Sequence, residues 1–185
     1  MKRFFSSFWS LFIVAGLIAA LDQWTKYLVR VNIPFAQQWM PAGLEWLTPY
    51  ARLVHWHNSG AAFGMFQRGS TVFTVLAFVV IGLIMYYYSR VSVEDWIVRL
   101  ALGMQMGGAA GNLISRLTLD GQVTDFISVG TFPVFNIADS SITVGVGVLL
   151  LGAWWGERGA KKQEKEQSSQ EEQEAENQDQ SSAQS

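Results

Sequence analysis

The 185-residue sequence has no cysteine, which excludes disulfide bonds, thiolate metal sites and a cysteine nucleophile. Its two histidines, His55 and His57, belong to no HExxH motif, which favours ordinary interfacial histidines over half of a metal site. Eight of the 15 acidic residues, but only four of the 13 basic ones, lie in residues 157–185. The net charge is therefore −4 in this tail and +2 before it, which gives no support for nucleic-acid binding.

Hydrophobic residues make up 50% of the sequence and gather in four long runs. These runs cover residues 4–21, 71–89, 96–117 and 138–155. A basic start would also suit a cleaved signal peptide, but the first run is too long for one and three more follow. We therefore expect an all-α membrane protein with four transmembrane helices in residues 1–156. Residues 157–185, rich in Gln, Glu and Ser, should form a disordered cytoplasmic tail.

The segment between the first two runs is polar and contains prolines and several tryptophans. Its residues 53–57 alternate enough to predict a strand, and Trp39, Trp46 and Trp56 suit a membrane surface. We expect this segment to form a small extracytoplasmic β-containing cradle between helices 1 and 2. Gly103, Gly107 and Gly111 recur every four residues in the third run, which favours close packing of that helix.

The distribution of basic residues predicts the orientation in the membrane. Four spans place eight of them on one side: Lys2, Arg3, Arg90, Arg99, Arg158, Lys161, Lys162 and Lys165. Four lie on the other side: Arg30, Arg52, Arg68 and Arg116. Since basic residues concentrate on the cytoplasmic side, both termini should be cytoplasmic.

This orientation brings all polar candidates to the extracytoplasmic boundary. They are Asp22, Lys26, Asn58, Asn112, Arg116, Asp125, Asn136 and Asp139. Ionisable residues so close to lipid are costly, and their convergence on one surface favours an active site. Structural alternatives remain open: an Asp22–Lys26 ion pair that holds a helix end, a snorkelling Arg116, and Asp139 as a helix cap.

Two close carboxylates, Asp125 and Asp139, would share a proton, so that one activates water and the other protonates the scissile carbonyl. The pattern thus predicts a membrane aspartyl hydrolase. A serine peptidase would instead pair Ser59 with a histidine, or Ser140 with Lys26. A small transporter or assembly scaffold is the non-enzymatic alternative, which the clustering of the charges at one boundary disfavours.

Five motifs occur in the order of a known family. They are Asp22-Gln23-x-x-Lys26, Asn58-x-Gly60-x-Ala62-Phe63-Gly64, Gly111-Asn112-x-x-x-Arg116, Val123-x-Asp125-Phe126 and Phe135-Asn136-x-Ala138-Asp139. Together they resemble lipoprotein signal peptidase, or signal peptidase II, over about residues 10–150. One position departs from the family pattern: Ser115 stands where members commonly carry an acid.

The resemblance implies a four-helix aspartyl endopeptidase of the bacterial inner membrane that needs no metal or cofactor. Such an enzyme cleaves the signal peptide from a prolipoprotein just before the cysteine that bears diacylglycerol. By this likeness Asp125 and Asp139 are the catalytic dyad. The supporting or substrate-binding residues are Asp22, Lys26, Asn58, Asn112, Arg116 and Asn136. The expected partners are the lipid-modified substrate and membrane lipids, with no nucleic acid, and the chain should work as a monomer.

Overall fold

The computed structural model describes residues 2–60 and 69–155, so the predicted tail, residues 157–185, lies outside the described residues. Within this part of the chain the main elements are four long helices. They are α1 (Lys2–Asn32), α2 (Gly69–Tyr88), α3 (Trp96–Thr118) and a last helix, Ile137–Trp155. The elements that position the polar candidates belong to the first of two compact units, Met1–Val148.

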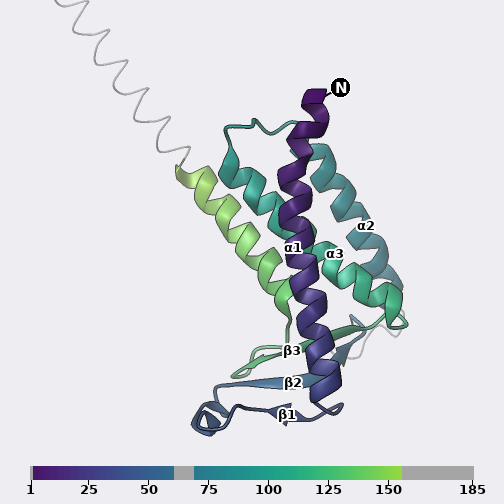
Figure 1. Ribbon diagram of the computed structural model, residues 1–185, viewed down its shortest axis with the longest axis vertical. Helices are drawn as coiled ribbons and strands as arrows, with labels where there is room; N and C mark the ends of the chain where they lie inside the picture. Colours follow the sequence, from purple (N-terminus) through teal and green to yellow (C-terminus); the bar gives the residue numbers. More distant parts are fainter. Residues whose placement is uncertain (1, 61–68, 156–185) are drawn as a thin grey trace, which may run out of the picture. The chain divides into compact units, whose positions relative to one another are not determined.

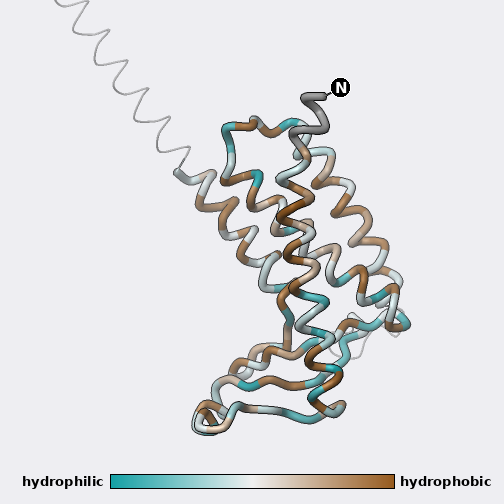
Figure 2. Tube along the Cα trace, viewed as in Figure 1, coloured by the Kyte–Doolittle hydropathy of each residue, from teal (hydrophilic) through white to brown (hydrophobic). Residues whose placement is uncertain are grey.

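Three helices of the described chain are long and apolar enough to cross a membrane: Phe8–Asn32, Ser70–Tyr88 and Ile137–Trp155. Most side chains of these stretches are exposed, among them Leu17 and Val72, as expected where lipid covers a protein. Figure 2 shows hydrophobic residues along α1 and α2. Because α3 is not among the three, the prediction of membrane spans is confirmed for three helices only.

Helix α1 continues well beyond the apolar run that predicted it. It extends to Asn32, so that Asp22 and Lys26 lie inside a helix rather than at its end. Neither residue disrupts a helix, and the first residue that does is Pro34, which also disfavours helical geometry in Ile33. The extra turns carry α1 to the β-sheet (Figure 1).

The sheet has three antiparallel strands in the order β1 (Gln38–Trp39), β2 (Ala51–Asn58) and β3 (Val123–Val129). A short 3-10 helix, Glu45–Leu47, lies between β1 and β2. The predicted strand is thus confirmed, but the cradle was placed too narrowly, because β3 comes from the segment after α3. The two strands that precede α2 would be only marginally stable by themselves, and β3 supplies the third strand that a stable sheet needs. Figure 1 shows the sheet below the end of α3, with the last turns of α1 beside the strands.

The glycines of α3 bring this helix against α1, as their spacing predicted. A Cβ atom on Gly103 would lie 2.9 Å from the Val14 side chain, and one on Gly107 would lie 2.8 Å from the backbone oxygen of Ala15. On Gly111 it would lie 2.6 Å from the Asp22 carboxylate. Only glycine allows this approach, which places Asp22 beside the polar end of α3.

Candidate active site

The last helix begins with a reciprocal cap that involves Asp139. Asn136 Oδ1 accepts a hydrogen bond from the backbone N–H of Asp139 at 3.1 Å, and Asp139 Oδ2 accepts one from the backbone N–H of Asn136 at 3.2 Å. This is a capping box, with asparagine as the N-cap and aspartate at the third helical position. The cap considered from the sequence is therefore real, and it fixes the carboxylate of Asp139 at a positive helix end.

Asp125 lies on β3, buried among amide donors. Its backbone pairs with Trp56 of β2, so Asn58, two residues further along β2, is on the same face of the sheet. Asn58 Nδ2 donates to Asp125 Oδ2 at 2.9 Å, and Asn136 Nδ2 donates to Asp125 Oδ1 at 2.6 Å. Only 2% of Asp125 is exposed. Asn136 thus holds both carboxylates, one with its side chain and one with its backbone.

Asn112 of α3 joins the two carboxylates to the charged pair of α1. It donates through Nδ2 to Asp139 Oδ1 at 2.8 Å, and its Oδ1 accepts from Lys26 Nζ at 2.8 Å and from Asn136 Nδ2 at 3.2 Å. Because the ammonium of Lys26 can only donate, the oxygen of the Asn112 amide must face it, which fixes the orientation of the amide.

Asp22 and Lys26 form the predicted ion pair, with Lys26 Nζ 2.7 Å from Asp22 Oδ2. Both side chains are completely buried. Asp22 Oδ1 also accepts the backbone N–H of Ala138 at 3.0 Å. The first N–H groups of a helix have no acceptor within that helix, and Asp22 provides an acceptor for one such group of the last helix, the N–H of Ala138. The pair therefore ties α1 to the helix that carries Asp139.

Gln23, which belongs to the first motif but was not among the predicted site residues, takes part in the same network. Its Nε2 donates to Asp22 Oδ2 at 3.1 Å, to the Gly111 carbonyl at 2.8 Å and to Ser115 Oγ at 3.1 Å. Ser115, the departure from the family pattern, is buried and also donates to the Gly111 carbonyl at 3.3 Å. A neutral hydrogen bond thus joins Gln23 of α1 to Ser115 of α3. The adjacent Asp22 and Lys26 were the signal that Gln23 would face α3.

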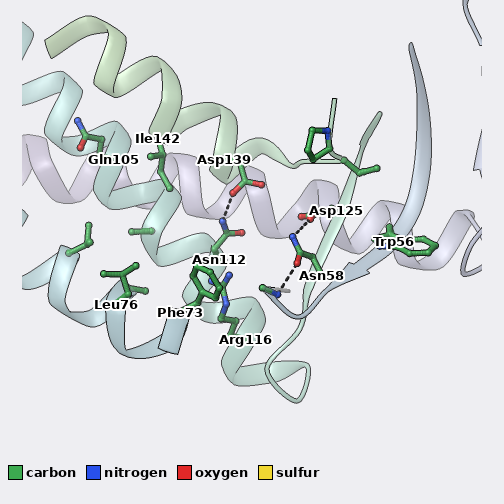
Figure 3. A pocket seen from close by; sticks show the side chains of 16 residues that line it. Trp56, Asn58, Phe73, Leu76, Gln105, Asn112, Arg116, Asp125, Asp139 and Ile142 are labelled. Atoms are coloured by element: carbon green, nitrogen blue, oxygen red, sulfur yellow. Dashed lines mark hydrogen bonds between the residues drawn. The ribbon is translucent and has the colours of Figure 1, made fainter. Parts of the chain in front are cut away.

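A cleft of about 580 Å³ opens beside the two carboxylates. Its polar lining comprises Asn58, Gln105, Asn112, Arg116, Asp125 and Asp139, and its apolar lining includes Trp56, Phe73, Leu76, Ala77, Val80, Val134 and Ile142. Figure 3 shows Asn112 directed to Asp139 and Asn58 to Asp125. The cleft therefore offers two carboxyl groups at the edge of an apolar space.

Arg116 lines the same cleft but is held differently from the other predicted residues. Its guanidinium carbon lies 5.5 Å from the centroid of the Phe73 ring, a cation–π distance. Its Nε atom is buried and has no hydrogen-bond partner in the part of the chain that the structure describes. All eight predicted residues thus come to one region, although Asp22, Lys26 and Asn136 do not line the cleft itself.

The surroundings of Asp125 favour its protonated form. Burial, reinforced by the charge of Asp139, raises the pKa of Asp125 to about 6, against the opposing hydrogen bonds from Asn58 and Asn136. A carboxyl group with this pKa exchanges its proton close to neutral pH, as a general acid or base requires.

The alternative catalytic pairs are engaged elsewhere. Ser140 Oγ donates to the Asn136 carbonyl at 2.9 Å, while Lys26 binds Asp22 and Asn112. His55 Nδ1 lies 2.7 Å from the Ile33 carbonyl, and its Nε2 lies 3.3 Å from His57 Nε2. Residues 2–60 and 69–155 contain no group of three or more metal-binding His, Cys, Asp or Glu residues.

Residues 14–155 match a family model described as signal peptidase (SPase) II. The chain belongs to this family. Among similar curated proteins, the lipoprotein signal peptidase of Shouchella clausii is 41% identical over 141 residues, which cover 76% of this chain and 89% of the relative. That of Halalkalibacterium halodurans is 36% identical over 156 residues, which cover 82% and 96%. The resemblance inferred from the motifs is thus confirmed.

Two solved structures, each described as a bacterial membrane enzyme, share the fold at 26% identity. One has a TM-score of 0.68 and covers 78% of this chain and 87% of its own, and the other has a TM-score of 0.69 with coverages of 77% and 91%. As a signal peptidase II, the chain is a membrane aspartic peptidase. The predicted enzyme class is therefore confirmed.

Proposed function

We propose that this signal peptidase II removes the signal peptide from diacylglyceryl-modified prolipoproteins and cleaves just before the lipidated cysteine. The observation that carries the proposal is the cleft in which Asp125 and Asp139 meet an apolar lining. An apolar space beside two carboxyl groups suits a substrate that carries lipid next to the bond to be hydrolysed. Lipoprotein signal peptidase is also the name of the curated relatives.

In the proposed mechanism Asp125 and Asp139 share one proton. The ionised carboxylate removes a proton from the attacking water, and the protonated one donates to the carbonyl oxygen as the tetrahedral intermediate forms. Asn136 and Asn112 hold the two groups in place, and Asn58 orients Asp125 from the sheet. Because these amides are already aligned, little reorganisation is needed at the moment of reaction.

The proposed setting is the bacterial inner membrane, where a monomer lies among lipids with both termini in the cytoplasm. In this arrangement residues 1–156 form a peptidase domain in which α3 is the third of four spans, and the cleft opens at the extracytoplasmic boundary. The natural absence of cysteine permits a direct test, because an introduced cysteine is unique. Ala42→Cys, in the cradle, should react with an impermeant maleimide added to intact cells. Glu94→Cys, between α2 and α3, should react only after permeabilisation, and the reverse pattern would contradict the orientation.

The catalytic proposal is tested by cleavage of a diacylglyceryl-modified prolipoprotein in detergent or bilayer. Asp125→Asn and Asp139→Asn should each lower kcat about 100-fold or more, because a general acid or base typically contributes about 10²- to 10⁴-fold to the rate. Circular dichroism and thermal unfolding establish that each variant is folded. Ser140→Ala and Ser59→Ala are matched controls that should retain turnover. Folded aspartate variants with near-normal activity would disprove the dyad, and an inactive Ser140→Ala would favour a serine mechanism.

A further inference from the structure

One polar side chain lies in the apolar part of the cleft, away from the two carboxylates. Gln105 of α3 lines the cleft together with Leu76, Val80 and Ile142. Its Nε2 atom is buried and has no hydrogen-bond partner among residues 2–60 and 69–155. Figure 3 shows Gln105 at the opposite end of the cleft from Trp56. The free enzyme therefore keeps an unused hydrogen-bond donor beside an apolar space.

The packing around Gln105 keeps the side chain in this position. A Cβ atom on Gly145 of the last helix would lie 2.9 Å from Gln105 Cγ, so glycine leaves the room that the glutamine stem occupies. A buried donor without an acceptor destabilises a protein, and the hydrocarbon region of a membrane provides little water to satisfy it. Leucine or methionine would fill the same space without this cost. The glutamine is thus unfavourable in the empty cleft.

The position of Gln105 relates it to the reaction centre. Gln105, Ala109, Asn112 and Arg116 follow one face of α3 and all line the cleft. Seven residues separate Gln105 from Asn112, which binds Asp139, and this corresponds to about 10 Å along a helix. About three residues of extended peptide span that distance. A substrate that is held at the carboxylates and runs along α3 would therefore reach Gln105.

We propose that Gln105 Nε2 donates a hydrogen bond to a carbonyl oxygen of the bound substrate and so helps to set the position of the substrate in the cleft. This role rests on the proposed function. The carbonyl belongs either to the signal peptide, about three residues from the cleaved bond, or to an ester of the diacylglyceryl group. Both sources present the same acceptor to the amide, and the substrate satisfies a donor that the free enzyme leaves unpaired.

The test compares wild-type enzyme with Gln105→Leu on two lipidated prolipoprotein peptides. One carries the natural diacylglyceryl ester, and the other carries a dialkylglyceryl ether that lacks the ester carbonyl. Gln38→Leu, an exposed glutamine of β1 outside this cleft, is the matched control. KM and kcat are measured separately, and thermal unfolding is followed for each enzyme. Loss of one hydrogen bond should raise KM about three- to tenfold with little change in kcat.

The two substrates distinguish the source of the carbonyl. A similar rise in KM on both identifies a peptide carbonyl, whereas a rise on the ester substrate alone identifies the lipid ester. Gln105→Leu should also raise the melting temperature by about 2–4 °C, since it removes the unpaired donor. An unchanged KM on both substrates, or a lower melting temperature with a loss of kcat, would overturn the role. Failure of the wild type to cleave either peptide would instead refute the proposed function on which it rests.

Discussion

The two faces of α3 differ in how completely their residues are packed and hydrogen bonded. The face toward α1 carries Gly103, Gly107 and Gly111, and every one of them excludes a larger residue. The opposite face lines the cleft and carries Gln105 and Arg116, which both have a buried nitrogen without a partner in the described chain. We call these the closed face and the open face. Asn112 lies at the edge of the open face and contacts residues on both sides.

The contrast separates stability from function along a single helix. Against the closed face, the Asp22–Lys26 pair of α1 is fully buried and hydrogen bonded, so removal of one member should unfold the site. On the open face unpaired groups lower stability and have no evident purpose in the empty cleft. Functional sites commonly keep such groups because a substrate satisfies them. The predictions below test whether changes on the two faces separate in this way.

The largest effect should come from Lys26→Met in α1, the helix that packs against the closed face. This substitution leaves the Asp22 carboxylate buried without its cation, which typically destabilises a protein by about 3–5 kcal/mol. Thermal and denaturant unfolding in detergent measure the loss. The double variant Asp22→Asn/Lys26→Met should be less destabilised than Lys26→Met alone, because no unpaired charge remains. Equal stability of Lys26→Met and wild type would show that the pair is not integral to the closed face.

Asp125→Asn at the carboxylate site should increase stability while it abolishes activity. Burial raises the pKa of Asp125 from 3.8, the value for the unfolded chain, to about 6 in the folded protein. The folded state therefore binds the proton of Asp125 more tightly than the unfolded state does. The contribution of this proton to the unfolding free energy is complete below about pH 4 and is lost as the pH rises through 6. At pH 8 the charged wild-type group thus costs up to about 3 kcal/mol, which the neutral amide avoids.

The measurement is the unfolding free energy of wild type and Asp125→Asn at pH 4, 6 and 8. The variant should gain about 2–3 kcal/mol at pH 8 and little at pH 4, the lower figure allowing for a repositioned Asn58 amide. Asp120→Asn, in the exposed turn after α3, is the control and should show no such trend. A gain that is the same at every pH would mean that burial of charge at Asp125 is not the cause.

Gly107→Ala tests the closed face by steric means. The new Cβ would lie 2.8 Å from both the Ala15 carbonyl and the Ile18 side chain, so α1 and α3 must separate. Overpacking of this kind costs about 1–3 kcal/mol. Gly16→Ala in α1 is the matched control, because nothing lies within 4 Å of its added Cβ, and helix propensity should make it neutral or stabilising. Equal melting temperatures for the two variants would contradict close packing through Gly107.

The sequence predicted the family and the local contacts of the site better than the long-range contacts that build it. Hydrophobic runs gave the helices, and the four-residue spacing of Asp22 and Lys26 gave their ion pair. The pairing of β2 with β3 was not predictable, since it joins segments that are about 70 residues apart and depends on the packing of α1 and α3. The role of Gln23 was missed for the same reason: its three acceptors come from α1 and α3 together.

The two roles considered for Asp139 are compatible with each other. A helix cap and a catalytic group were weighed as alternatives, but the capping box positions a carboxylate that also lines the cleft. Local motifs reveal a cap because its partners are three residues apart. The partner amide from Asn112 is 27 residues away, and only the folded chain brings it to Asp139.

The smallest change in stability should come from Arg116→Met on the open face. Methionine removes a buried Nε that has no partner in the described chain, but it also removes the cation–π contact with Phe73. Because these two effects oppose each other, the unfolding free energy should change by no more than about 0.5 kcal/mol. Loss of a positioned cation beside Asp125 and Asp139 should still lower kcat/KM about tenfold or more. Cleavage assays and thermal unfolding on one preparation measure both. If Arg116→Met lost stability as Lys26→Met does, Arg116 would belong with the closed face, and the division of α3 into a structural and a functional face would fail.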